Sequence, residues 1–266
     1  MACAVEEGGE GIFLSSQCPG AACLTCALLK TEVPIVVLFR VRRALVLLLA
    51  ATALPFAARA AASEGLPTRG PIAPYLMPDH QAEVALARSA APPSIAGKAE
   101  VLVLTSHGFE TAVKGTNGFV CLVERSWTAP FNDTEFWNPK ERGPDCYNPP
   151  AARTEIPQLL QEAQWALAGL SRQQMVERTR AAVTDHSFKP PEPGAFGFML
   201  SKKGYLNHAH GPWYPHMMFF IPRDQVASWG PNVDSSPTQS VDRGPYLSTL
   251  IMVPVLMWSD GSPGPH

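Results

Sequence analysis

Phe119-Val120-Cys121-Leu122-Val123-Glu124-Arg125 is the stretch that decides the fold. Residues 119–123 are apolar without interruption, and the side chains of a strand alternate between its two faces. A strand that is apolar on both faces is buried on both, so this stretch is predicted to be a central strand of a sheet. The Asn117-Gly118 dipeptide before it is a strong tight-turn signal. It predicts a hairpin in which residues 109–114 pair with residues 119–125.

The segments on either side of this hairpin predict the fold class. A further buried strand is expected at Val101-Leu102-Val103-Leu104, and three more at residues 196–201, 216–221 and 249–257. Helices are expected after three N-cap residues, Asp79, Thr154 and Ser171. Residues 126–152 are rich in Pro and Gly and are predicted to be irregular. This order of elements predicts an α+β domain with a mainly antiparallel sheet and two or three short helices.

A secretory signal lies far from the start of the chain. Arg40, Arg42 and Arg43 form a basic cluster, an apolar run follows over residues 44–58, and a small-residue site ends at Ala60. These are the three parts of a signal peptide, which begins here about forty residues later than usual. Residues 41–60 are therefore interpreted as the signal peptide, cleaved after Ala60 or, as the second choice, after Ala62. Residues 1–40 are interpreted as a mis-called upstream extension, with a long n-region as the alternative.

The apolar run predicts export rather than membrane anchoring. A spanning helix needs about 20 apolar residues, whereas this run is shorter and contains Pro55. The expected location is periplasmic or secreted, with no stable membrane anchor after cleavage. Residues 61–77 are predicted to be a flexible lead-in, and residues 78–266 a single α+β domain.

The charge of the mature chain excludes one class of partner. The leader holds 5 of the 21 Lys and Arg residues and 4 of the 23 Asp and Glu residues, which leaves 16 against 19 and a net charge of −3. Neither sign forms a long run, so no nucleic-acid partner is expected.

Two cysteines, Cys121 and Cys146, remain after the predicted cleavage. A pair of cysteines in an exported domain usually forms a disulfide, which is the prediction here. Two buried free thiols are the alternative.

A histidine cluster offers ligand chemistry. His208-Ala209-His210 lies close in sequence to His216. Residues i and i+2 of a strand share a face, so these imidazoles are candidate ligands for zinc or copper. The alternative is that residues 207–212 form a polar loop whose histidines are solvated.

Other chemical signals are weaker. No Gly-x-Ser-x-Gly motif and no glycine-rich phosphate loop is present. Glu110 and Glu124 could face each other across the predicted hairpin as an acid pair, although solvation or pairing with Lys114 and Arg125 is favoured. Five tryptophans lie in or beside expected loops, where they are interpreted as lids on the core or, alternatively, as a binding platform: Trp127, Trp137, Trp213, Trp229 and Trp258.

Four segments carry a resemblance. Gly115–Trp127, Phe136–Lys140, Met199–Leu206 and Trp213–Pro222 resemble a family of exported bacterial proteins. The resemblance implies export but supplies no mechanism, because that family carries no assigned function. The family segment reads Trp-His-Pro-His, whereas Tyr214 stands in place of the first histidine here. This departure weakens a metal site that would use that first histidine.

The predicted function follows from these signals together. The chain is expected to be an exported, non-catalytic binding or structural module with an unknown ligand or protein partner. The alternative is a metal-dependent enzyme built on His208, His210 and His216.

Overall fold

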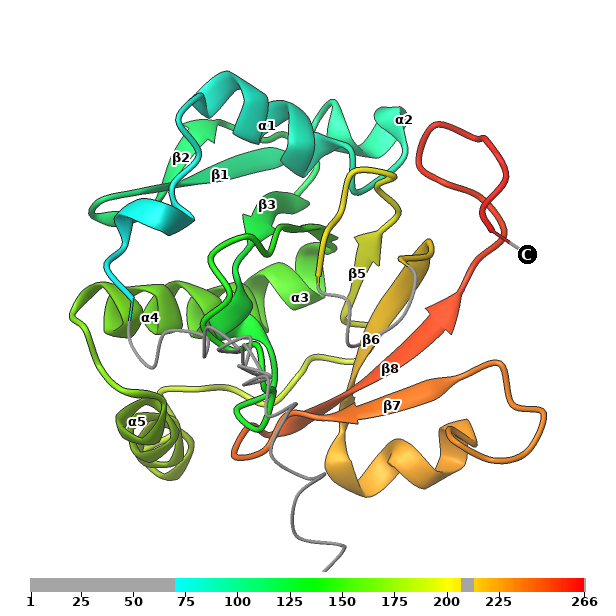
Figure 1. Cartoon of the computed structure of the whole chain (residues 1–266). Helices are drawn as coiled ribbons and strands as arrows, with labels where there is room; N and C mark the ends of the chain where they lie inside the picture. Colours follow the sequence, from blue (N-terminus) through cyan, green and yellow to red (C-terminus); the bar gives the residue numbers. More distant parts are fainter. Residues whose placement is uncertain (1–69, 207–212, 266) are drawn as a thin grey trace, which may run out of the picture. The chain divides into compact units, whose positions relative to one another are not determined.

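The computed structural model describes residues 70–206 and 213–265, which form one α+β domain with an eight-stranded sheet. The strand order is β2-β1-β3-β4-β5-β6-β8-β7, and the β1–β3 pair alone is parallel (Figure 1). The predicted fold class is therefore confirmed. The strands are β1 (Glu100–Thr105), β2 (Gly108–Val113), β3 (Val120–Glu124), β4 (Gly143–Tyr147), β5 (Phe196–Met199), β6 (His216–Pro222), β7 (Gln239–Asp242) and β8 (Ser248–Pro254).

Helices cover both faces of the sheet (Figure 1). On one face, Val84 and Ala87 of α1 pack with the β1 and β3 residues Val101, Val103 and Val123. On the other face, α3 and α4 pack against Leu102 and Leu122. Within the described residues the α-helices are α1 (His80–Arg88), α2 (Pro93–Ala96), α3 (Pro149–Thr154), α4 (Ile156–Leu167) and α5 (Arg172–Thr184). No helix among residues 70–206 and 213–265 is both long and apolar enough to cross a membrane.

The central position predicted for residues 119–125 is confirmed. β3 lies between β1 and β4, and Cys121, Leu122 and Val123 are all completely buried. Cys121 and Val123 contribute to the core beneath α1, while Leu122 contributes to the core beneath α4. Burial on both faces explains why this strand has no polar residue before Glu124.

The predicted hairpin between residues 109–114 and 119–125 is wrong. β2 instead pairs with β1 through a tight turn at Ser106-His107, in which Thr105 lies opposite Gly108. β3 pairs with the other edge of β1, in parallel. Strands joined by two residues pair directly as a hairpin, and this short connection joins β1 to β2.

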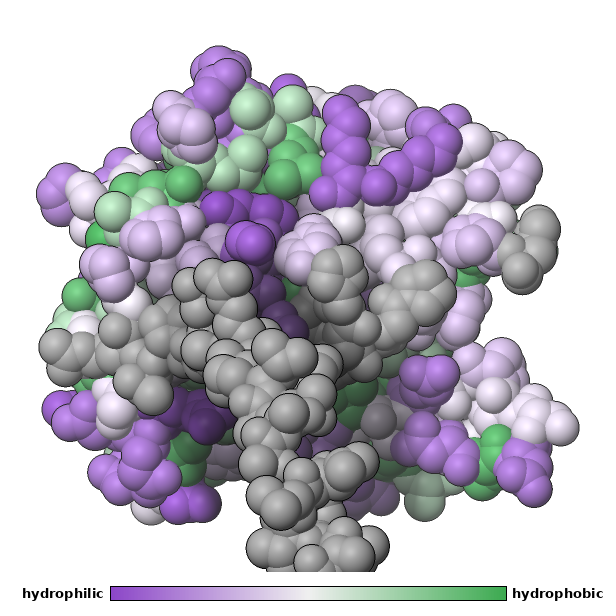
Figure 2. Space-filling view, viewed as in Figure 1, coloured by the Kyte–Doolittle hydropathy of each residue, from purple (hydrophilic) through white to green (hydrophobic). Residues whose placement is uncertain are grey.

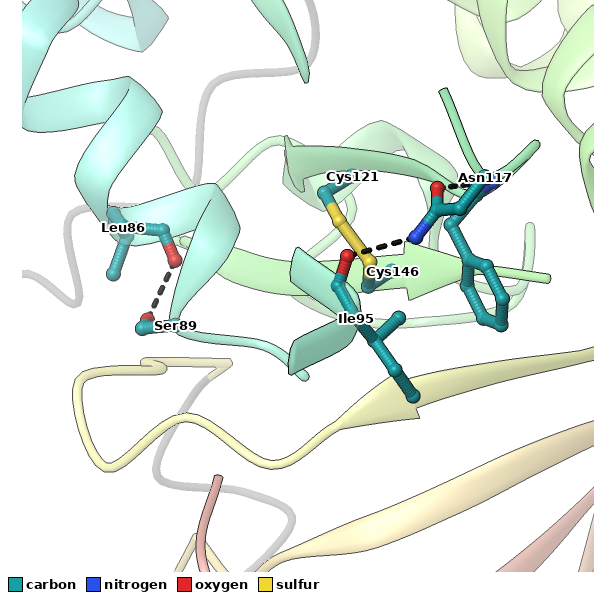
Figure 3. Close-up of a disulfide and its surroundings, with 7 residues drawn as sticks. Leu86, Ser89, Ile95, Asn117, Cys121 and Cys146 are labelled. Atoms are coloured by element: carbon teal, nitrogen blue, oxygen red, sulfur yellow. Dashed lines mark hydrogen bonds between the residues drawn. A yellow bond between two sulfur atoms is a disulfide. The ribbon is translucent and has the colours of Figure 1, made fainter. Parts of the chain in front are cut away.

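The Asn117-Gly118 pair has a different role from the predicted hairpin turn. Gly118 has a φ of 76°, a conformation that glycine adopts without strain. The Asn117 side chain donates to the carbonyl of Ile95, at 2.9 Å, and accepts from the amide of Phe119, at 3.1 Å. These bonds tie the loop before β3 to α2, as Figure 3 shows beside the disulfide.

The disulfide prediction is confirmed. Cys121 and Cys146 lie directly opposite each other on β3 and β4, and they are bonded (Figure 3).

Strand β4 itself falls in the segment predicted to be irregular. It begins with Gly143-Pro144, and such residues argue against a strand unless they lie at its first positions, as they do here.

The first helix buries a charged residue and exposes two alanines. Asp79 is the N-cap as predicted, and its side chain accepts from the Gln81 amide at 2.8 Å. Ala82 and Ala85 are exposed, whereas Glu83 is completely buried. Figure 2 accordingly shows apolar surface over α1. The reason is tertiary, because Glu83 pairs with Arg125 at the end of β3.

Of the two later N-caps predicted, Ser171 is confirmed and Thr154 is wrong. Ser171 and Gln174 form a reciprocal capping box at the start of α5. α4 ends just before Gly169, whose φ of 73° stops the helix. Thr154 is the last residue of α3 rather than the N-cap of α4. The Asn148 side chain caps α3, so the helical segment begins before the predicted start.

Candidate functional site

A pocket of about 870 Å³ opens beside the end of β3 and the strands β6, β7 and β8. Its wall contains three methionines and several aromatic rings, together with a few buried polar groups. The lining residues that carry the chemistry are Glu124, Glu141, Met199, Trp213, Tyr214, His216, Met218 and Met252.

Glu141 presents an unsatisfied carboxyl group to this pocket. The residue is 6% exposed, and its Oε2 atom has no hydrogen-bond partner among the described residues. Burial raises the pKa of Glu141 to about 9, and the carboxylates of Asp133, Glu124 and Glu135 add to the effect, while Arg142 opposes it. The Glu141 carboxyl group is therefore protonated at neutral pH.

Glu124, the last residue of β3, also lines the pocket. Its Oε1 atom accepts a short hydrogen bond from the Tyr147 hydroxyl, and its Oε2 atom accepts one from Thr128 at 2.8 Å. Burial raises the pKa of Glu124, although these hydrogen bonds partly offset the rise. The donors fix the carboxyl group in one orientation.

A second acid, Asp145, interacts electrostatically with Glu124. Asp145 on β4 is completely buried, and neither carboxyl oxygen has a hydrogen-bond partner among the described residues. Burial, followed by the charge of Glu124, raises its pKa well above the usual range. A Cβ atom at Gly197 on the neighbouring strand would lie 2.5 Å from Asp145 Oδ1. Glycine at position 197 therefore makes room for this carboxyl group.

Arg243 supplies positive charge behind the pocket. It donates to Glu155 at 2.6 Å and to Ser248 at 2.8 Å, and its guanidinium carbon lies 4.4 Å from the ring centre of Tyr246. Burial lowers the pKa of Arg243, but the attraction of Glu155 and Glu162 outweighs burial and raises it. Burial also raises the pKa of Glu162 to about 8, against the opposing charge of Arg243.

The predicted histidine cluster is described only in part. His216 lies in the pocket wall and is 3% exposed, whereas His208 and His210 lie outside the described residues. The Nδ1 atom of His216 is 2.9 Å from the carbonyl of Tyr214, which can only accept, so Nδ1 carries the proton. Burial lowers the pKa of His216, and its ring is neutral with Nε2 as an acceptor. Within the described residues no three His, Cys, Asp or Glu side chains are grouped to hold a metal ion.

The suggested pair of Glu110 and Glu124 is wrong. Glu110 lies opposite Val103 on the edge strand β2, and β1 separates β2 from β3. The favoured alternative is also wrong for Glu124, which is half-buried and bonded to Tyr147, while Arg125 pairs with Glu83.

The predicted tryptophans lie in different surroundings. Trp127 and Trp137 are buried in the core beside Tyr75, as the lid interpretation predicts. Trp213 lines the pocket, where its ring meets His216 edge-on with the centres 5.3 Å apart.

Sequence reasoning missed Glu141, Asp145 and Tyr147. All three lie in the segment predicted to be irregular, and no motif marks them. One signal was available: Glu124-Arg125 places two charges directly after a buried strand, where each charge needs a buried partner.

Comparison with protein-family models, curated proteins and solved structures gave no significant match, so the site is interpreted from its geometry and chemistry.

Proposed function

We propose that this chain is an exported, non-catalytic binding protein that holds a small ligand in the pocket beside the end of β3. The observation that supports the proposal is the pocket of about 870 Å³, with an apolar and aromatic wall and a few buried polar groups. Small-molecule sites in proteins have this size and composition.

Its place of action is the periplasm or the outside of the cell. The disulfide between Cys121 and Cys146 is typical of proteins that fold in an oxidising compartment. The predicted signal peptide at residues 41–60 supports the same location, although it lies outside the described residues.

Two neighbouring residues on β8 allow a matched test. Met252 lines the pocket, whereas the next residue, Val253, is not part of the lining, because successive side chains of a strand point to opposite faces. Tryptophan at position 252 is expected to fill the pocket, and tryptophan at position 253 to leave it open.

The measurement is the thermal shift of the purified protein with a library of small polar and charged compounds. Compounds that bind in the pocket raise the Tm of the wild type and of Val253→Trp, but not that of Met252→Trp. The proposal fails if no compound stabilises the wild type, or if Met252→Trp responds equally.

A metal-dependent enzyme is the second candidate. One observation favours it: His216 donates from Nδ1 to a backbone carbonyl, and this contact orients Nε2 as metal-binding histidines require. The test is metal analysis of the purified protein and of His216→Ala. Stoichiometric zinc or copper in the wild type, lost in the variant, would support this candidate over the binding module.

A further inference from the structure

The titratable groups in the described wall of the pocket are mainly acidic. Among the described lining residues there are four acids and no Lys or Arg: Glu124, Asp133, Glu141 and Asp242. His216 is the one histidine among these described lining residues, and it is neutral because burial lowers its pKa. A cleft lined by one sign of charge concentrates ligands of the opposite sign.

Glu141 is the carboxyl group in this wall that needs a partner. Asp242 is paired with Arg223 at 2.6 Å, and both oxygens of Glu124 accept hydrogen bonds. Glu141 is more than nine-tenths buried, and Oε2 has no partner among residues 70–206 and 213–265. A buried carboxyl oxygen without a partner is costly, so a ligand that brings a hydrogen-bond donor or a positive charge to this point lowers the free energy.

The charged groups facing Glu141 come from several segments. Asp133 and Glu135 lie on the preceding loop and Glu124 at the end of β3, and all three repel its negative charge. Arg142, the next residue, attracts it, although the Arg142 guanidinium donates to the carbonyls of Pro139 and Glu141 itself. Among the described residues, Arg142 is the cation that acts on Glu141, against three acids that repel its negative charge.

Another part of the wall is aromatic. Trp213 and Tyr214 line the pocket, and both rings pack against His216, with ring centres 5.3 and 5.2 Å apart. Aromatic ring faces attract cations, and tryptophan does so most strongly. Acids and aromatic rings on the walls of one pocket favour an ammonium group over an anion or a neutral alcohol.

We propose that the ligand is an organic cation, with its ammonium head beside Glu141 and its apolar body against Trp213 and the methionines. This inference rests on the proposed binding function and names its ligand class.

Binding of such a cation is linked to proton release. The Glu141 carboxyl group is protonated in the empty pocket at neutral pH, because burial and neighbouring acids raise its pKa to about 9. A bound cation favours the ionised form, so the carboxyl group loses its proton on binding. Affinity for the cation therefore rises with pH, by up to about tenfold per unit between pH 6 and 8.

The probes are choline and its neutral carbon isostere, 3,3-dimethylbutan-1-ol. Choline cannot lose a proton from its quaternary nitrogen, so any proton released comes from the protein. Isothermal titration of the protein expressed from the full chain, in buffers of different ionisation enthalpy, measures both affinity and proton release. We expect choline to bind with release of up to one proton, and the alcohol to bind at least about tenfold more weakly.

Glu141→Gln is the matched variant, because it keeps the shape of the side chain and removes the ionisable group. At pH 9 it is expected to bind choline at least about tenfold more weakly than the wild type, with no proton release and no pH dependence. Glu110→Gln on the edge strand β2 is the control and is expected to behave as the wild type. The Tm of each variant without ligand shows that it is folded.

Three results would overturn the inference. Equal binding of the alcohol and choline would leave the proposed binding function intact, but it would show that the pocket does not prefer a cation. If Glu141→Gln binds choline as tightly as the wild type does, the ammonium group does not lie beside Glu141. If neither probe binds, the proposed ligand class is wrong. The compound screen with Met252→Trp then tests the binding function separately.

Discussion

Glu83→Gln is the substitution that tests the buried ion pair behind the pocket. Glu83 on α1 and Arg125 after β3 lie 2.7 Å apart, and neither side chain has any exposed surface. Arg125 also donates to the carbonyls of Tyr75 and Val123, so its hydrogen bonds largely survive the substitution. What the variant removes is the negative charge that balances the buried guanidinium.

The size of the effect follows from this burial. Burial lowers the pKa of Arg125, and the charge of Glu83 is what favours its protonated form. Removing one partner of a buried pair costs about 3–5 kcal/mol, because the other charge is left uncompensated. For a domain of this size, such a loss lowers Tm by about 6–20 °C.

The assay is urea unfolding with the disulfide intact, followed by tryptophan fluorescence. Glu192→Gln is the matched control, because Glu192 and Arg153 are as close, at 2.6 Å, but both are exposed. Exposed pairs contribute little, so this variant is expected to unfold at the wild-type urea concentration. The double variant Glu83→Gln/Arg125→Met is expected to recover part of the loss, since it removes the unpaired charge as well.

One result of the urea experiment would contradict the prediction for Glu83→Gln. If Glu83→Gln unfolds at the same urea concentration as Glu192→Gln, the buried pair does not hold α1 against the end of β3.

Three further predictions concern stability. The variant Cys121→Ser/Cys146→Ser is expected to lose about 3–4 kcal/mol of unfolding free energy in urea, because the bond closes a loop with a sequence separation of 25; wild-type protein with reductant should approach the same midpoint. Gly197→Ala is expected to lose about 1–3 kcal/mol, because its Cβ atom meets Asp145 Oδ1 at 2.5 Å; in a double-mutant cycle with Asp145→Ala, additive losses would contradict this contact. Glu162 has a pKa of about 8, above its ordinary 4.5, so its contribution to stability is fully present below pH 4.5 and is lost as pH rises through 8. Urea midpoints from pH 5 to 8 should therefore fall less in Glu162→Gln than in the wild type, and an equally steep fall in both would show that Glu162 does not titrate as described.

Local signals in the sequence predicted several elements correctly. The apolar run at residues 119–123 predicted a central strand, and Asp79 and the Ser171–Gln174 pair predicted helix starts. Each depends on side chains close together in the chain: an uninterrupted run of apolar residues, or a side chain that accepts from an amide two or three residues later. The pairing of Cys121 with Cys146 was predictable for a different reason, because the domain that follows the predicted signal peptide has two cysteines, which offer one pairing.

Strand pairing was decided by the tertiary structure. The Asn117-Gly118 signal predicted a hairpin, but the hairpin formed at Ser106-His107 instead. β1 pairs with β2 on one edge and, in parallel, with β3 on the other, so the Asn117-Gly118 turn became a connection anchored to Ile95. Parallel pairing depends on contacts distant in sequence, which no local pattern records.

The candidate site depended on the tertiary structure most of all. Glu141, Glu124 and Trp213 come from distant parts of the sequence, and they meet because β3 and β6 belong to one sheet with the intervening loop beside it. The sequence alone determined that the chain has buried strands, two cysteines that can pair and charges next to an apolar run. Only the folded chain decided that Glu83 neutralises Arg125, while Oε2 of Glu141 is buried without a hydrogen-bond partner among the described residues. Burial and charge pairing are properties of surroundings assembled in three dimensions.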